Sequence, residues 1–152
     1  MFHGIIFKEL PSEDICHHLS AEANQLVFDP KHHHIVTKRF SNIWVAQETE
    51  LSSVSFTEVH HPRRAIVMAW TRLDNMDELI QRHQLNPAIT PTELILHLYF
   101  KLKENCVKSL LGDFSFAIYD IDAQRLFCAR DPMGVKPLYY YHHPLGFAFS
   151  TS

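Results

Sequence analysis

Histidine and cysteine side chains are the first candidates for chemistry in this sequence of 152 residues, which contains 12 histidines and 3 cysteines. Two tracts, Cys16–His18 and His32–His34, bring together ligands of the kind that zinc prefers. The side chains of adjacent histidines point in different directions on both strands and helices. Two histidines that bind one metal ion must instead project from the same face. We therefore expect no metal site and interpret the His-rich tracts as solvated, the second one as a loop.

The adjacent pair Arg130 and Asp131 is a second candidate, because it fits either a catalytic dyad or a turn. The turn is favoured, since Asp131-Pro132-Met133-Gly134 has the composition of a type I turn. The aspartate side chain of such a turn accepts hydrogen bonds from backbone N–H groups. The chain has only 4 glycines and no glycine-rich phosphate cradle. We therefore expect no ATP and no other cofactor in this domain.

Charge and composition exclude several classes of partner. The formal net charge is -3 and the 14 basic residues are scattered, which argues against nucleic acid and anionic membranes as partners. No apolar run approaches the roughly 20 residues of a membrane-spanning helix. The odd number of cysteines and the absence of an export signal before them predict a reducing, cytoplasmic setting.

Short β-prone segments dominate the first seventy residues. The strands predicted from β-branched and aromatic runs are His3–Lys8, Asn42–Ala46, Val54–Val59 and Ala65–Trp70. Between the first two, apolar residues recur at three- and four-residue steps, which predicts a helix from Ser12 to about Leu26 with Ser12 as its N-cap.

Helical signals follow in the second half. Asp74–His83 predicts a short helix capped by its first residue. Thr90–Glu93 combines an N-cap threonine, a proline at the first helical position and a glutamate three residues after the cap. The apolar face behind it breaks around Lys103–Asn105, which predicts one long or two consecutive helices closed by Gly112.

A two-residue period returns near the end of the chain. Phe114–Tyr119 and Arg125–Cys128 predict a hairpin, and Leu138–Tyr141 and Phe147–Ser150 predict two more strands. We expect Tyr139–Tyr141 to place one face in the core. These elements together indicate an α+β layered domain with a mostly antiparallel sheet.

Two longer segments, Leu110–Asp120 and Leu126–Tyr140, closely resemble the class II glutamine amidotransferase domain of asparagine synthetases. Arg72–Leu79 and Glu93–Leu96 are similar to the asparagine-synthetase-like branch that includes lasso-peptide macrolactam synthetases. The resemblance implies the N-terminal-nucleophile fold, a four-layer αββα sandwich with two mostly antiparallel sheets. One domain is expected over residues 1–152, truncated at its C-terminal end, with the synthetase domain absent.

The resemblance also implies a mechanism and a set of motif residues. An amino-terminal cysteine attacks the glutamine amide, its own α-amino group is the base, and ammonia passes to a synthetase domain, where ATP and magnesium are expected. The motif residues expected to be structural are Arg72, Asp74, Asn75, Glu93, Gly112, Asp113, Arg130, Asp131, Gly134, Pro137 and Tyr139.

Several positions depart from the family pattern. Phe2 stands at the place of the nucleophile, and a phenyl ring has no lone pair with which to attack an amide. The Asn-Gly dipeptide that holds the oxyanion and substrate falls on Trp70 and Thr71. The aspartate for the substrate ammonium falls on Pro91, and the arginine for its carboxylate falls near Thr49. We therefore expect a degenerate pocket, no catalytic residue and no glutaminase activity.

Three functions remain open. The first is an inactive domain that braces the synthetase domain of an ATP-dependent amide ligase, in cis or in trans, with a peptide as one candidate substrate. The second is the glutamine-hydrolysing domain of an ordinary asparagine synthetase. The third is a stand-alone module that binds a peptide or protein at an exposed sheet edge. Unshielded aromatic residues near the chain end predict self-association of the isolated domain, namely Tyr140, Tyr141, Phe147 and Phe149.

Overall fold

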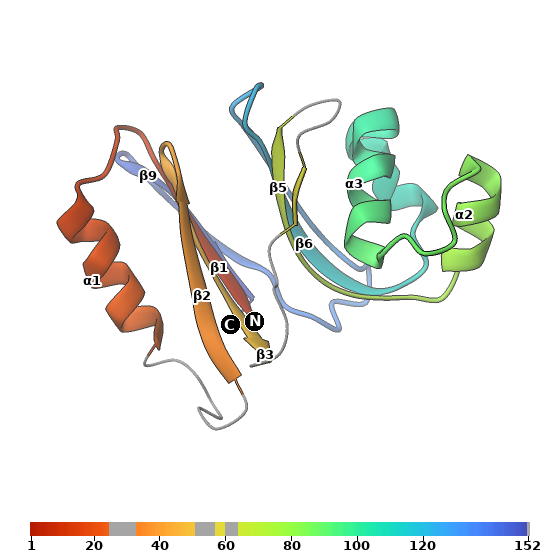
Figure 1. Cartoon of the computed structure of the whole chain (residues 1–152), viewed down its shortest axis with the longest axis horizontal. Helices are drawn as coiled ribbons and strands as arrows, with labels where there is room; N and C mark the ends of the chain where they lie inside the picture. The colour runs from red at the N-terminus through yellow and green to blue at the C-terminus, as the bar shows by residue number, and fades with distance from the viewer. Residues whose placement is uncertain (25–32, 51–56, 60–63, 152) are drawn as a thin grey trace. The chain divides into compact units, whose positions relative to one another are not determined.

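The computed structural model describes residues 1–24, 33–50, 57–59 and 64–151 (Figure 1). The chain divides into two compact units. One consists of Met1–Ser55 and Leu138–Ser152 and contains both chain ends, and the other consists of Phe56–Pro137. We refer to them as the terminal unit and the central unit.

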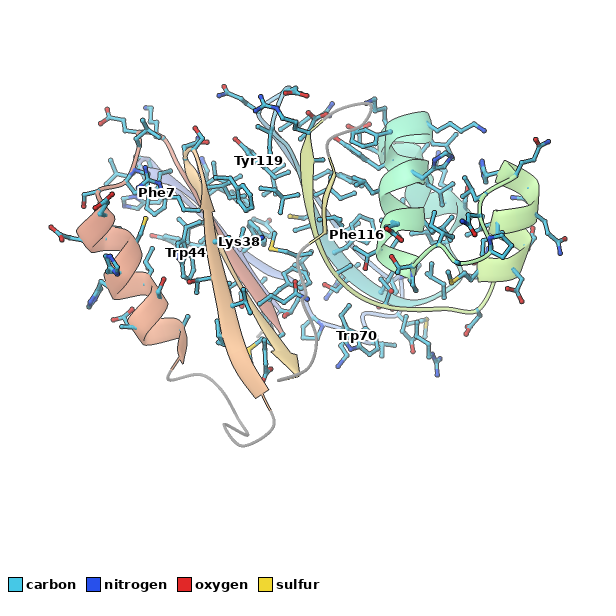
Figure 2. All side chains as sticks on the ribbon, viewed as in Figure 1. Phe7, Lys38, Trp44, Trp70, Phe116 and Tyr119 are labelled. Carbon is cyan, nitrogen blue, oxygen red and sulfur yellow. The ribbon has the colours of Figure 1, made fainter. Side chains whose placement is uncertain are left out.

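The terminal unit is a five-stranded antiparallel sheet with one helix. Its strands, in the spatial order β2-β3-β1-β9-β8, are β2 (His33–Phe40), β3 (Ile43–Glu50), β1 (Phe2–Phe7), β9 (Gly146–Ser150) and β8 (Tyr139–His143). Helix α1 (Glu13–Asn24) lies along one face of this sheet (Figure 1). Trp44 of β3, labelled in Figure 2, donates a hydrogen bond from Nε1 to the Ser20 hydroxyl of α1 over 3.3 Å. The indole thereby joins the helix to the sheet.

Helix α1 begins as the sequence predicts. The Ser12 hydroxyl accepts a hydrogen bond from the backbone N–H of Ile15 over 3.3 Å, which is the N-cap contact. The helix ends at Asn24, and its predicted extension to Leu26 lies outside the described residues.

The central unit is a four-stranded antiparallel sheet with helices after its second strand. The strands, in the order β4-β5-β6-β7, are β4 (Thr57–Val59), β5 (Ala65–Leu73), β6 (Gly112–Asp120) and β7 (Arg125–Arg130). The helices are α2 (Met76–His83), α3 (Pro91–Leu102) and the 3-10 helix η1 (Lys103–Ser109). Alternate residues of β6, among them Phe116 in Figure 2, form one buried core with Leu94 and Leu98 of α3.

The predicted capping box of α3 is confirmed. The Thr90 hydroxyl accepts from the Glu93 backbone N–H over 3.2 Å, and a Glu93 carboxylate oxygen accepts from the Thr90 backbone N–H over 2.8 Å. The predicted break is also present, because Lys103 has a φ of 55° and separates α3 from η1.

Two predicted helix boundaries were wrong. The N-cap of α2 is Asn75 rather than Asp74, and it makes no side-chain cap hydrogen bond. Gly112 does not close the helical segment, because η1 ends at Ser109 and Gly112 begins β6 with a φ of 126°. A Cβ atom on Gly112 would lie 2.1 Å from the Arg72 carbonyl oxygen, so glycine is required by the close approach of two strands.

Strand β2 was not predicted from the sequence. His33 and His34 belong to this strand rather than to a loop, and their backbones pair with Glu50 and Thr49 of β3. His32 lies outside the described residues. The β-branched run Ile35-Val36-Thr37 was the available signal, but the preceding histidines obscured it.

Strand β8 corrects the prediction for the tyrosines. It is an edge strand of the terminal sheet, and Tyr139, Tyr140 and Tyr141 are 59%, 76% and 64% exposed, so neither face of this stretch lies in the core. Phe149 was expected to be exposed, but it is 2% exposed. Its strand β9 pairs with β1, where the Phe149 ring lies over Gly4 and meets Phe2 edge to face.

The α+β class with antiparallel sheets is confirmed by these elements. In the part of the chain that the structure describes, no helix has the length and apolar character needed to cross a membrane.

The capping box gives a stability prediction. Replacing Thr90 with alanine removes the N-cap hydroxyl and should lower the free energy of unfolding by about 1 kcal/mol, measured by urea denaturation. Thr92→Ala, in the same turn, is the control and should cost less than about 0.5 kcal/mol. Equal effects of the two changes would contradict the capping role.

The same contact fixes a pH dependence. Hydrogen bonds from the Thr90 backbone and hydroxyl lower the pKa of Glu93. The stabilisation is therefore present above the ordinary glutamate pKa and is lost as the pH falls through the lowered value. Thr90→Ala should reduce this loss of stability in acid.

The edge strand gives a prediction about association. Strand β8 carries three exposed tyrosines and no Lys, Asp, Glu or Pro, which are the residues that commonly protect sheet edges. We expect the isolated chain to self-associate, and Tyr140→Lys should shift light scattering toward the monomer mass. Leu10→Lys changes a residue that is 68% exposed outside any strand and should have no effect. A chain that is monomeric at high concentration would contradict this prediction.

Candidate functional site

The side chain of Phe2, near the start of the chain, is packed in the protein interior. The Phe2 side chain is 1% exposed, and its ring meets Phe149 edge to face with 6.4 Å between centroids. The Phe2 backbone N–H donates to the Thr151 hydroxyl over 2.9 Å, and the Thr151 N–H donates to the Phe2 carbonyl over 3.1 Å. Residue 2 is therefore fixed on both its side chain and its backbone.

Glycine at position 4 makes this packing possible. A Cβ atom on Gly4 would lie 2.1 Å from the Phe149 Cζ atom, so any larger residue would displace the ring. Gly4 and Phe149 are direct partners in the β1–β9 pairing. The Phe149 ring thus lies over the backbone of β1 and beside Phe2.

The α-amino group belongs to Met1 and has its own ionic partner. Its nitrogen lies 3.8 Å from a carboxylate oxygen of Glu48 on β3. An amine that is to act as the base for a nucleophile must lie on, or next to, the nucleophilic residue. Here the residue that follows the amine has a phenyl side chain.

His3 and Ser150 form a contact that sequence reasoning missed. Their side chains approach to 2.7 Å between Nδ1 and Oγ, across the pairing of β1 with β9. The two residues are 147 positions apart, so no local spacing in the sequence indicates the contact.

Trp70 lies in the second half of β5 in the central unit and is followed by Thr71 in the same strand. The Trp70 side chain, labelled in Figure 2, is 36% exposed. The Lys136 ammonium lies 4.2 Å from its ring centroid, a cation–π contact. The sequence resemblance predicts small, donor-bearing residues here, and the structure has an indole with an ammonium over its face.

Pro91 is the first residue of α3, directly after the cap residue Thr90. Its ring offers no carboxylate and no hydrogen-bond donor. Thr49 lies in β3, opposite His34, and its side chain is outside the described part of the structure. Phe2 and Thr49 belong to the terminal unit, and Trp70, Thr71 and Pro91 to the central unit.

The motif residues of the central unit join β5, α2 and β6. Arg72 and Asp113 are direct cross-strand partners and form an ion pair at 3.0 Å. The Asn75 side chain donates to the Ser109 carbonyl over 2.9 Å and accepts from the Leu111 N–H over 3.0 Å. Asp74 contributes its backbone, since its N–H donates to the Leu111 carbonyl over 2.8 Å.

The loop after β7 is organised by Asp131. Its side chain is 2% exposed and accepts from the Val135 N–H over 3.2 Å, while the Gly134 N–H donates to the Asp131 carbonyl over 3.1 Å. Burial opposes ionisation of Asp131, but the backbone amides of residues 134–136 outweigh it, so the pKa of the carboxyl is lowered. The carboxylate of Asp131 therefore accepts hydrogen bonds within its own loop.

Arg130 and Gly134 meet across the same loop. Gly134 has a φ of 69°, and a Cβ atom built on it would lie 3.5 Å from the Arg130 guanidinium carbon. Pro137 follows this loop, and Tyr139 begins the exposed strand β8.

Metal ligands do not converge in the described residues, where no group of three or more His, Cys, Asp or Glu side chains has the arrangement needed to hold an ion. Two of the cysteines are shielded. Burial raises the pKa of the Cys106 thiol to about 11 and that of Cys128 to about 12. Neither thiol is ionised near neutral pH, and a thiol reacts as the thiolate.

Comparison with known proteins identifies the family. A family model described as a glutamine amidotransferase domain matches residues 52–152. The chain belongs to this family of class II glutamine amidotransferase domains, related to asparagine synthetases. The match begins after β1 and therefore does not cover the amino-terminal position.

Two relatives show the same relationship. A putative glutamine-hydrolysing asparagine synthetase 2 of Methanocaldococcus jannaschii is 48% identical over 62 residues, which are 41% of this chain and 12% of that protein. The glutamine-hydrolysing asparagine synthetase 3 of Bacillus subtilis is 38% identical over 78 residues, 51% of this chain and 13% of that protein. The chain thus matches about an eighth of the length of these relatives.

A solved structure shows the fold. The glutamine phosphoribosylpyrophosphate amidotransferase of Bacillus subtilis, in complex with ADP and GMP, matches with a TM-score of 0.67 at 13% identity. The match covers 99% of this chain and 41% of that chain. The predicted N-terminal-nucleophile type of fold, with its two antiparallel sheets, is confirmed at the level of the fold.

Proposed function

We propose that this chain is a glutaminase-inactive amidotransferase domain and that it serves as a structural partner of a synthetase domain. The parent enzyme would be an asparagine-synthetase-like ligase that forms an amide bond with ATP and magnesium. Both would bind in the synthetase domain, because this chain has no glycine-rich phosphate loop.

The packing of Phe2 is the observation that carries the proposal. Hydrolysis of glutamine through a covalent intermediate needs a nucleophilic atom at the reacting amide carbon, with a base within hydrogen-bond reach. Residue 2 instead directs a phenyl ring into a contact with Phe149. The Met1 amine is held near Glu48. Neither a nucleophile nor its base is present at the family position.

The central unit supports the same conclusion. An oxyanion site requires donors placed where negative charge develops. At Trp70 the structure has an indole with Lys136 over its face, and at Pro91 it has a helix start without a carboxylate. The substrate ammonium would therefore lack its counter-charge even if a nucleophile were supplied.

The sequence also suggests which acceptor substrate the parent enzyme would use for amide formation. The likeness of Arg72–Leu79 and Glu93–Leu96 to the branch with lasso-peptide macrolactam synthetases favours a peptide acceptor and a macrolactam product. A domain that keeps its fold but has no glutamine chemistry suits such a ligase, because a peptide amine can attack the activated carboxylate without ammonia. This hypothesis rests on the sequence resemblance.

Glutamate release from glutamine tests the proposal. The purified chain should release no more glutamate than a buffer blank, because Phe2 supplies no nucleophile. Phe2→Cys should remain inactive, since Trp70 and Pro91 are unchanged, and its intact mass would show whether Met1 is removed.

A glutamine-hydrolysing asparagine synthetase serves as the positive control for the assay. Turnover by Phe2→Cys alone would show that the glutamine pocket is intact and would favour an ordinary asparagine synthetase. Turnover by the unchanged chain, resistant to repurification, would overturn the proposal.

A further inference from the structure

A pocket of about 460 Å³ lies in the terminal unit between α1 and the sheet. Its walls are mainly apolar, and the residues that form them include Ile5, Leu19, Ala23 and Trp44. His3 and Ser150 line the same pocket and supply a polar end. It is therefore a concave, mostly apolar space with a small number of polar groups, as small-molecule sites commonly are.

The polar end has the geometry of a nucleophile and its base. The Ser150 Oγ and the His3 Nδ1 are 2.7 Å apart, within the range for a hydroxyl that donates to an imidazole. Both side chains project from paired inner strands, β1 and β9, so the backbone fixes their separation. The Nε2 atom of His3 is buried without a hydrogen-bond partner, which leaves Nδ1 as the ring atom in contact with a polar side chain.

The charged groups around His3 favour a neutral imidazole. Burial lowers the pKa of His3 most, the Met1 ammonium lowers it further, and Glu48 of β3 partly offsets both. Glu22 of α1 lines the same pocket, and one of its carboxylate oxygens lies 3.1 Å from the Nε2 atom of His18. At neutral pH the ring therefore has a free lone pair, and it can accept the serine proton from Ser150.

We propose that His3 and Ser150 are a base and a nucleophile for acyl transfer from small activated esters, with the acyl group in the pocket under α1. This activity is separate from glutamine hydrolysis. It uses the helix side of the terminal sheet and needs neither a residue of the central unit nor the position of Phe2.

The step balances without a co-reactant other than water. The Ser150 oxygen bonds to the ester carbonyl carbon, its proton passes to Nδ1 of His3, and the ester oxygen leaves with that proton as an alcohol. Water then attacks the acyl-serine, again giving a proton to His3. The acid is released and the serine hydroxyl is restored.

Covalent labelling with an alkyl fluorophosphonate tests the pair directly. The serine oxygen displaces fluoride and bonds to phosphorus, so intact mass and peptide mapping identify the residue. We expect one adduct, at Ser150, and none in Ser150→Ala. His3→Gln keeps a hydrogen-bonding side chain but removes the base, so the labelling rate should fall by about 100-fold or more.

Two controls keep the test decisive. Ser12→Ala changes an exposed helix-cap serine that does not line the pocket, and this variant should label at the original rate. Melting curves of all variants show that the fold is retained, and if Ser150→Ala unfolds, His3→Gln alone decides the outcome. The labelling rate should rise as the pH increases through the lowered pKa of His3, and it should reach a plateau below pH 7. No adduct beyond that of the heat-unfolded chain, an adduct on another residue, or an equal rate in His3→Gln would overturn the proposal.

Discussion

The contact of Phe2 with Phe149 over the backbone of Gly4 is the interaction on which the terminal unit depends. It joins the first strand to the last, and three hydrogen bonds between Phe2 and Thr151 stabilise the same junction. The sequence resemblance places the nucleophile of active relatives at residue 2, and we propose that this chain has lost it. In this chain the same position contributes packing, and burial of an aromatic side chain stabilises the fold by a few kcal/mol.

The central unit keeps its architecture by contacts that are independent of any substrate. The Arg72–Asp113 ion pair, the Asn75 side-chain bonds and the close approach at Gly112 fix β5, α2 and β6. These contacts give the motif residues a structural role that does not depend on glutamine hydrolysis. The motif residues of the central unit thus specify the scaffold, and under the proposed function the departures from the family pattern fall on the positions that would contact the substrate.

Much of the fold could be predicted from local patterns. The α3 capping box, the β6–β7 hairpin and the turn at Asp131 are encoded by residues a few positions apart. Strand β2 was missed, because histidines masked its β-branched run, and the burial of Phe149 was missed, because it depends on pairing with a strand at the other end of the chain. The same reason hid the His3–Ser150 contact, since only the sheet brings these residues together.

The free energy of unfolding of Phe2→Ala tests the central claim most directly, namely that this position is core and not active site. Phe7→Ala, on the same strand but only partly buried, is the matched control. If Phe2 is packed as described, its replacement should cost about 3–5 kcal/mol, the range for a buried phenylalanine, and clearly more than the control. A cost within about 0.5 kcal/mol of zero would contradict the account, because such values belong to surface positions.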